Sequence, residues 1–202
     1  PIHTMALVAS SHVTNHALMK TVPYAMSDLA PVTMTAQVQL GLVVNPSLPV
    51  NNVKELIAYL KANPGKVAVA TSGRGSNPQL WALTFQRLTG TQMIDVAYKG
   101  SAAAHPDLLA GQTQVMFDAV AAVMPHVKAG KLKLLAVGGA KRSPFLPDTP
   151  TMEEAGVPGY VMASWGAIIL PSKTPKPVVD FLHREIVAVL FTQSIPPGGT
   201  DL

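Results

Sequence analysis

A loop rich in glycine and hydroxyl groups is the first place where this sequence could do chemistry. The segment "TSGRGSNPQL", residues 71–80, directly follows the apolar run "KVAVA". Glycines let a backbone approach a ligand closely, serine hydroxyls donate hydrogen bonds, and the start of a helix offers unpaired N–H groups. The loop therefore suits a carboxylate or a phosphate, and an ordinary helix-capping turn is the alternative. Phosphate is less favoured, because no Lys-Ser or Lys-Thr follows at P-loop spacing and G-x-G-x-x-G is not completed.

Two further loops occupy the same position relative to a predicted strand. One covers residues 98–101, after "DVA", and the other is the turn after Asp118, at the end of "VMFD". In open α/β sheets, ligands bind beyond the carboxyl ends of the strands, where such loops gather. Asp118 could fix an amine or a hydroxyl of a ligand, or it could cap the following helix. We therefore expect the loops at 71–77, 98–101 and after Asp118 to lie together.

Other kinds of catalytic or metal site find less support. His12 and His16 are four residues apart, which would suit zinc on a helix, but residues 11–16 indicate a loop and no third ligand is near. A solvent-exposed or hydrogen-bonding pair is the favoured interpretation. There is no G-x-S-x-G elbow, and neither Ser72 nor Ser76 has a histidine at a recognisable spacing, which weighs against a serine hydrolase. Because the chain has no cysteine, thiolate catalysis and disulfides are excluded. We expect no metal and no cofactor.

Composition narrows the function further. The 202 residues are 48% hydrophobic and only 13% charged, which excludes a disordered chain. No apolar run approaches the roughly 20 residues of a membrane span. The net charge of +4 is scattered and aromatic residues make up 5%, so nucleic-acid binding is not expected, whereas a small anionic ligand suits a mild positive excess. The start at Pro1 lacks a charged region followed by an apolar one, so no signal peptide is expected within this chain.

Strands and helices are expected to alternate along most of the chain. Apolar strands linked by short glycine-containing turns to helices imply right-handed βαβ units, and hence a parallel sheet with helices on both faces. Asn52 with Glu55 should cap one helix, Ser101 should cap another, and Pro106 should shorten that second helix. The expected strands lie at 4–10, 38–46, 66–71, 92–100, 114–119, 132–139 and 160–169, and the expected helices at 51–65, 78–90, 101–111, 120–130, 151–155 and 174–190.

Four segments together resemble one known family. They are "NPSLPVNNVKELIAYLKANPGKVAVATSGRGS", "DVAYKGSAAAHPDLLAGQTQVMFD", "PHVKAGKLKLLAVGGAKRSPFLPDTPTMEEAGVPGY" and "SWGAIILPSKTPKPVV". They are similar to the periplasmic solute receptors of tripartite tricarboxylate transporters, also called Bug receptors. The resemblance runs in order from about residue 4 to residue 190. The combination of "AYKGSAAA", "AGKLKLLAV" and "KRSPFLPDTPTMEEAG" carries its specificity.

The resemblance implies a two-lobed, type II-like periplasmic binding protein with α/β lobes that close on a small organic acid. Such a protein is not an enzyme and is expected to be a monomer in the periplasm, where it delivers a dicarboxylate, tricarboxylate, amino acid or aromatic acid to membrane transporter subunits. Arg74 adds a charge where many relatives have a small or polar residue. Carried over by position, the ligand-binding candidates are Ser72, Gly73, Gly75, Ser76, Tyr98, Lys99, Gly100, Ser101 and Asp118 of the second lobe, and Ser10, Ser11 and His12 of the first.

The end of the chain departs from the family pattern. Family chains open with a Pro-Pro-Gly-Gly loop that is missing before Pro1, whereas "IPPGGTDL" ends this chain. The first lobe is therefore expected to be incomplete, in a chain that is permuted, truncated or assembled from segments. If the loop takes its family place, Gly198, Gly199 and Thr200 complete the carboxylate site. The expected organisation is 1–50 in the first lobe, 51–155 in the second, 156–190 returning to the first through the hinge, and 191–202 as the displaced loop.

A sensor module and a serine-dependent α/β hydrolase remain alternative functions. A sensor built on the same receptor fold would work with a partner kinase instead of a transporter. A hydrolase would use Ser72 or Ser76 with a distant histidine.

Overall fold

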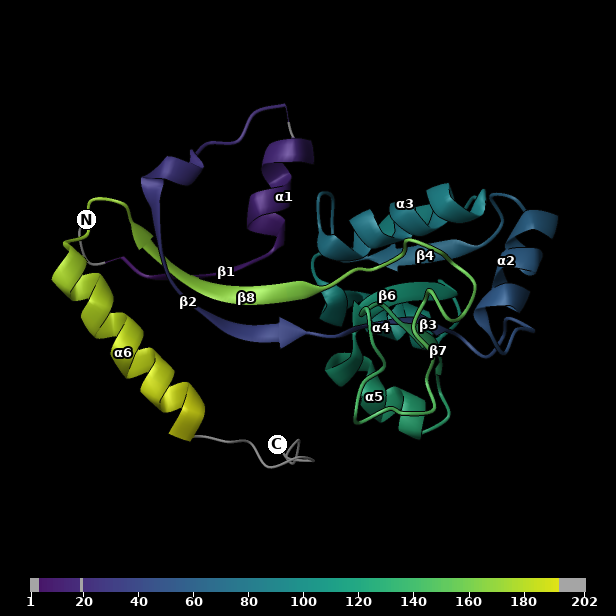
Figure 1. The fold of residues 1–202 in the computed structure, drawn as a ribbon. Helices are drawn as coiled ribbons and strands as arrows, with labels where there is room; N and C mark the ends of the chain where they lie inside the picture. The colour runs from purple at the N-terminus through teal and green to yellow at the C-terminus, as the bar shows by residue number, and fades with distance from the viewer. Residues whose placement is uncertain (1–3, 19, 193–202) are drawn as a thin grey trace. The chain divides into compact units, whose positions relative to one another are not determined.

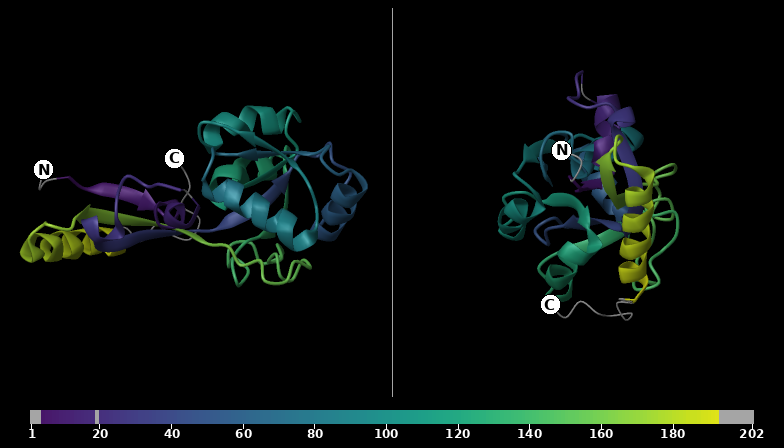
Figure 2. Two further views of the ribbon diagram at one scale, coloured as in Figure 1. Left: turned by 90° about the horizontal axis from the view of Figure 1, so that it is seen from above. Right: turned by 90° about the vertical axis from the view of Figure 1, so that its left-hand side faces the viewer.

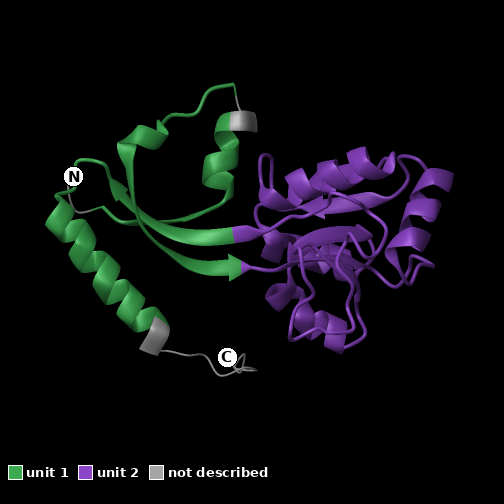
Figure 3. Ribbon diagram, in the orientation of Figure 1, with its two compact units in different colours: residues 1–37, 165–202 green, residues 38–164 purple. Residues whose placement is uncertain are grey.

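A computed structural model describes residues 4–18 and 20–192 and contains two compact units (Figure 1, Figure 3). Unit 1 comprises residues 1–37 and 165–202, and unit 2 comprises residues 38–164. Residues 40–44 and 156–164 thus belong to unit 2. The predicted lobe boundaries at residues 50 and 155 stay predictions. In the part of the chain that the structure describes, no helix is long and apolar enough to cross a membrane.

Unit 2 is built on a mixed sheet whose strand order is β5-β4-β6-β3-β7. Strand β4 pairs in parallel with β5 and β6, which confirms the parallel pairing expected for this region. Strand β3 runs antiparallel to both β6 and β7, so the sheet is not parallel throughout. The strands span Leu40–Val44 for β3, Ala68–Thr71 for β4, Ile94–Ala97 for β5, Val115–Ala119 for β6 and Lys133–Val137 for β7.

Helices cover both faces of this sheet, as the sequence predicted (Figure 2). Successive residues of β6 alternate between two apolar clusters, because side chains of a strand point to opposite faces. Phe117 packs with α2 and α3 residues, whereas Met116 packs with α4 and α5 residues. Both side chains are almost fully buried. The helices span Val53–Ala62 for α2, Asn77–Thr89 for α3, Ser101–Leu109 for α4 and Val120–Lys128 for α5.

Capping residues in the sequence predicted some helix ends correctly and others wrongly. The Asn52 side chain accepts a hydrogen bond from the Glu55 N–H, as predicted. For α4 the N-cap is Gly100 and Ser101 is the first helical residue, so the prediction that Ser101 caps this helix is wrong. Pro106 lies inside α4, which continues to Leu109. The fully buried Leu108 anchors this last turn, so packing compensates for the hydrogen bond that proline cannot make.

The predicted helix at 151–155 is a single hydrogen-bonded turn. The Glu154 N–H donates to Thr151 Oγ1, and the Thr151 N–H donates to Glu154 Oε2. The two residues thus form the reciprocal start of a helix. The chain leaves the helical conformation at Gly156, whose φ is 100°. A glycine in this conformation, followed by Pro158, stops the helix after one turn.

Unit 1 holds a three-stranded sheet of order β1-β8-β2, with β1 antiparallel to β8. Strand β2, "LAPVTMTAQV", was not predicted, and it contains Pro31, a residue that strand interiors normally avoid. Since β2 lies at the edge of its sheet, a proline is tolerated there. Residues 11–16, expected as a loop, are helical. The elements are β1 Ala6–Ala9, α1 Ser11–Leu18, a 3-10 turn Met26–Asp28, β2 Leu29–Val38, β8 Ser164–Pro171 and α6 Lys176–Thr192.

Helix α6 lies alongside the sheet of unit 1 (Figure 2). His183 Nδ1 is 2.9 Å from the carbonyl oxygen of Val32 in β2. Five apolar residues recur at helical spacing along this helix, and they differ in burial. Leu182 and Ile186 are half-buried, whereas Val178, Phe181 and Leu190 are 43%, 52% and 39% exposed. The described part of unit 1 therefore covers these side chains only in part.

Candidate functional site

The three glycine-containing or acidic loops of unit 2 meet at one edge of its sheet, formed by the carboxyl ends of three neighbouring parallel strands. Strands β4, β5 and β6 are parallel neighbours, so their carboxyl ends lie together. The Tyr98 N–H donates to the Thr71 carbonyl (2.9 Å), and a Cβ on Gly73 would lie 3.4 Å from the Tyr98 carbonyl oxygen. The Ser101 hydroxyl donates to Asp118 Oδ1 (2.9 Å). Residues that are far apart in the sequence thus form one continuous surface at the start of α3 and α4.

The β4–α3 loop turns on two glycines and closes with a helix cap. Gly73 and Gly75 have φ values of 118° and 74°, in the region that favours glycine. The Ser76 Oγ accepts from the Gln79 N–H, and the Gly75 N–H donates to Gln79 Oε1 (2.7 Å). Ser76 therefore caps α3, which is the alternative that the sequence left open for this loop. The half-buried Ser72 lies between β4 and the first of these glycines.

An aspartate that sequence reasoning missed is hydrogen-bonded to both ends of this loop. Asp95 of β5 accepts a hydrogen bond from the Thr71 hydroxyl (2.8 Å) and another from the Gln79 side-chain amide. The carboxylate thus connects β4, β5 and the first turn of α3. Its signal in the sequence was weak, since a single charge in "QMIDVAYKG" indicates an exposed position as readily as a structural one.

The β5–α4 loop carries Tyr98, Lys99 and Gly100. The Tyr98 hydroxyl donates to Asp107 Oδ2 (2.7 Å), so the phenol is held by helix α4, which follows the loop. Burial raises the pKa of Tyr98, and the hydrogen bond to Asp107 raises it further. Lys99 is exposed, and Gly100 turns into the helix with a φ of 99°. This loop therefore presents the first backbone N–H groups of α4, together with the Lys99 ammonium.

Asp118 is the centre of a buried polar cluster. Its side chain is only 7% exposed. Oδ1 accepts from the Ser101 hydroxyl and from the Ala119 N–H (2.8 Å), and Oδ2 lies 2.8 Å from His105 Nε2. The N-cap of α5 is Ala119, so Asp118 does not cap that helix. Sequence reasoning missed His105, although its position four residues after Ser101 puts both side chains on one face of α4.

The first-lobe candidates Ser10, Ser11 and His12 lie in unit 1, at the start of α1. The His12 ring stacks on Tyr24 with centroids 4.1 Å apart, and His16 meets the same ring edge-on at 5.0 Å. The interpretation of residues 11–16 as a loop was wrong, because they belong to α1. The two histidines of this helix pack against the Tyr24 ring. Within the described residues no group of three possible ligands could hold a metal ion.

Two parts of the predicted site stay predictions. Nothing described places Ser10, Ser11 and His12 beside the loops of unit 2, so their joint role is untested. Gly198, Gly199 and Thr200 lie outside the described residues.

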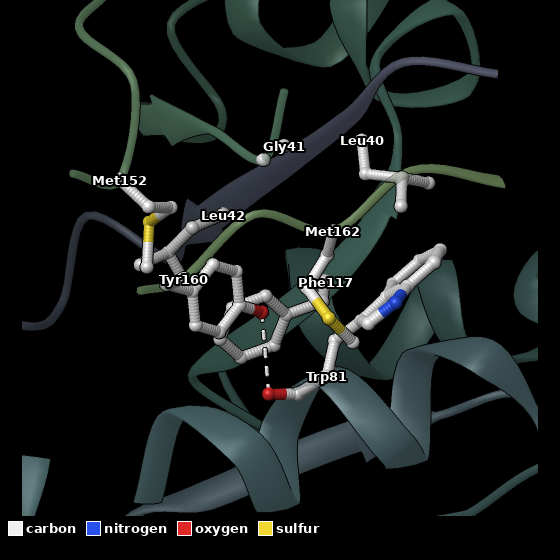
Figure 4. A pocket seen from close by; sticks show the side chains of 9 residues that line it. Leu40, Gly41, Leu42, Trp81, Phe117, Met152, Tyr160 and Met162 are labelled. Atoms are coloured by element: carbon white, nitrogen blue, oxygen red, sulfur yellow. Dashed lines mark hydrogen bonds between the residues drawn. The ribbon is translucent and has the colours of Figure 1, made fainter. Parts of the chain in front are cut away.

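A small cavity inside unit 2 does not serve as the ligand site (Figure 4). It measures about 10 Å³, which is at most the space of one water molecule. Its walls are apolar, and the Tyr160 hydroxyl beside it donates a hydrogen bond to the Trp81 carbonyl oxygen (3.2 Å). Burial raises the pKa of Tyr160 strongly. The cavity is a packing defect of the core lined by Leu40, Gly41, Leu42, Trp81, Phe117, Gly138, Met152, Tyr160 and Met162.

Residues 2–194 match the family described as "Tripartite tricarboxylate transporter family receptor". The chain belongs to this family. It is 36% identical over 196 residues to Protein BugT of Bordetella pertussis, covering 96% of this chain and 60% of the relative. A UPF0065 protein of Bordetella bronchiseptica is 33% identical over 98% of this chain and 60% of its own length.

Solved structures confirm the fold of a periplasmic binding protein. An R. palustris protein solved with adipate has a TM-score of 0.87 at 37% identity, covering 92% of this chain and 63% of that one. The periplasmic binding protein BugD has a TM-score of 0.83 at 33% identity, over 92% and 61%. The malate-bound MatC of Rhodopseudomonas palustris has a TM-score of 0.86 at 26% identity, over 95% and 66%. The chain spans about 60% of the length of each of these two curated relatives.

Proposed function

We propose that this protein is an extracytoplasmic solute receptor, which captures a small organic carboxylate and delivers it to a tripartite tricarboxylate membrane transporter. The observation that carries the proposal is the meeting of the β4–α3 and β5–α4 loops at the carboxyl edge of the unit 2 sheet. Family membership of residues 2–194 supports the transport role. The adipate and malate in two related structures support the carboxylate class.

The carboxylate would be held mainly by backbone. The N-termini of α3 and α4 point their first N–H groups toward the same edge, and each helix adds a partial positive charge there. Gly73 and Gly100 let the chain approach a ligand without side chains in between. The exposed cations Arg74 and Lys99 add long-range attraction for an anion. The hydroxyl of Ser72 would supply a further donor.

The proposed setting is the periplasm, with the protein acting as a monomer. Relatives with solved structures are described as a periplasmic transporter and a periplasmic binding protein. The proposed partners are the small carboxylate and the membrane subunits of the transporter, and no nucleic acid is involved. A sensor module of the same fold is the second candidate, and it would signal through a kinase.

The geometry of the Asp118 cluster weighs against a hydrolase. In a catalytic triad the histidine lies between serine and aspartate, because it must take the serine proton. Here Asp118 lies between Ser101 and His105, and the Ser101 hydroxyl donates to the carboxylate directly. Ser76 is engaged in capping α3, and within the described residues no hydrogen bond joins a histidine to Ser72 or Ser76. We therefore propose that the protein binds its ligand without turning it over.

The test is a thermal-shift and calorimetry panel of small carboxylates: succinate, malate, adipate, citrate, glutamate, aspartate, pyroglutamate, nicotinate and benzoate. A ligand at about 100 times its Kd stabilises the native state by about 2.7 kcal/mol, which shifts the Tm of a chain this size by several degrees. We expect one or two acids to bind and the others to leave the Tm unchanged. Cooperative melting with no shift for any acid would contradict the proposal, and turnover of an ester substrate would favour the hydrolase.

A further inference from the structure

The Asp118 cluster fixes the direction of the Ser101 hydroxyl. An ionised carboxylate only accepts hydrogen bonds. Asp118 receives the Ala119 N–H and the Ser101 O–H on Oδ1, and it receives His105 Nε2 on the other oxygen. The Ser101 hydroxyl therefore donates its proton to Asp118 and has none left to donate to a ligand. The imidazole of His105 holds the second carboxylate oxygen, so Asp118 cannot turn away from Ser101.

A serine held in this way offers lone pairs and no proton. Ser101 is the first residue of α4 and is half-buried at the edge where the loops meet. Its Oγ can accept a hydrogen bond from a ligand, but it cannot donate one to a ligand carboxylate. The buried negative charge of Asp118, 2.9 Å behind this oxygen, strengthens the acceptor and disfavours a second acceptor in front of it.

Resting on the proposed function, we propose that Ser101 selects ligands that carry a hydrogen-bond donor beside their carboxylate. The backbone N–H groups at the start of α4 would hold the carboxylate, and the Oγ of the same helical turn would accept from an adjacent hydroxyl or ammonium group. Donor and carboxylate must then sit on neighbouring carbon atoms of the ligand. The preferred substrate class is therefore 2-hydroxy and 2-amino acids, in preference to unsubstituted carboxylic acids of the same skeleton. His105 acts as a positioning residue through Asp118.

The experiment compares matched ligands that differ only at the second carbon. Calorimetry measures Kd for succinate, malate and aspartate, for glutarate, 2-hydroxyglutarate and glutamate, and for adipate and 2-aminoadipate. In the unsubstituted protein, the hydroxy or amino acid of at least one set should bind about tenfold tighter than its plain counterpart, which is the effect of one net hydrogen bond. The variant Ser101→Ala should reduce this ratio to about one, and Ser101→Thr, which keeps the hydroxyl, should retain most of it.

Two controls keep the outcome readable. Ser47 is exposed and follows the end of β3, which lies beside the amino end of β6 and therefore away from Asp118 at its carboxyl end. Ser47→Ala should leave the ratio unchanged. Asp118→Asn has nearly the same size but lacks the charge, so it should weaken the preference for the ammonium more than that for the hydroxyl. This second variant tests the proposal even if Ser101→Ala does not fold.

The two levels of the proposal fail in different ways. If no acid of these sets or of the wider carboxylate panel binds, the receptor function fails and the selectivity fails with it. If plain acids bind as tightly as their substituted counterparts, or if the ratio survives in Ser101→Ala, the receptor function stands and the role of Ser101 is overturned.

Discussion

At the scale of single residues, the acidic side chains near the candidate site are all occupied by internal donors. Asp95 binds a hydroxyl and an amide, Asp107 binds the Tyr98 phenol, and Asp118 binds a hydroxyl, a backbone N–H and an imidazole. Each carboxylate is therefore turned toward the protein. This arrangement leaves the helix N-termini and two exposed cations to set the potential at the edge of the sheet. An anion can approach the loops although carboxylates lie close by.

Tyr98 gives a pH-dependent prediction at this scale. Burial and the hydrogen bond to Asp107 raise its pKa above the ordinary value of 10.0. The unfolded chain then releases the phenolic proton first as pH rises, so this contribution to stability is complete below about pH 10 and is lost above it. Urea unfolding between about pH 8 and 11 should show stability falling on the alkaline side, and Tyr98→Phe should make that fall shallower. Tyr160, whose pKa burial also raises, should behave likewise. Equal slopes in wild type and Tyr98→Phe would contradict the assignment.

At the scale of elements, the site depends on the turns that connect strands to helices. Each of the loops after β4 and β5 reaches its helix through a glycine with positive φ, at Gly73 and Gly100. Only glycine adopts these conformations without strain. The turns bring the start of α3 close to the start of α4, since a Cβ on Gly73 would lie 3.4 Å from the Tyr98 carbonyl oxygen. The shape of the binding edge is thus set by backbone, and side chains such as Asp95 hold it in place.

Gly73→Ala should therefore damage binding more than it damages stability. The substitution forces alanine to a φ of 118° and brings its Cβ to 3.4 Å from the Tyr98 carbonyl oxygen, at a cost of about 1–3 kcal/mol unless the loop moves. We expect the loop to move and the carboxylate affinity to fall at least tenfold. Gly130→Ala is the matched control, because its φ of 69° is also unfavourable for alanine but nothing lies within 4 Å. Calorimetry on both variants decides the matter, and equal losses of affinity would refute a specific role for the loop.

At the scale of the whole molecule, the buried core belongs mainly to unit 2. Both large apolar clusters lie within residues 38–164, and β3 is buried along its entire length. Among the buried apolar side chains of the described residues, only Val32 and Leu170 belong to unit 1. Since burial of apolar surface supplies most of the folding free energy, unit 2 should be the more stable part.

Hydrogen exchange should show this difference directly. We expect the slowest amides in β3, β4 and β6, whose opening requires unfolding of the unit 2 core, and faster exchange in β1 and β2 of unit 1. Mass spectrometry of peptides under native conditions measures both. Protection of β1 and β2 equal to that of β6 would show instead that the two units unfold together.

The sequence by itself determined the family, most elements of unit 2 and the loops that meet at the sheet edge. These features rest on local signals: apolar runs gave β4 and β6, the Asn52 cap gave α2, and glycine-serine loops marked strand ends. It missed β2, because the edge position that tolerates Pro31 is a property of the sheet. It also read residues 11–16 as a loop, because their polar pattern lacks the apolar stripe of a buried helix.

Only the tertiary structure decided what the polar side chains do. Ser101 could have been a cap or a donor, and Asp118 a cap or a ligand contact. The structure shows both bound to each other, with His105 as a third member that lies 13 residues from Asp118. Hydrogen bonds have direction, and each proton can be given only once. A sequence lists donors and acceptors, whereas only their arrangement in space shows which of them are already paired.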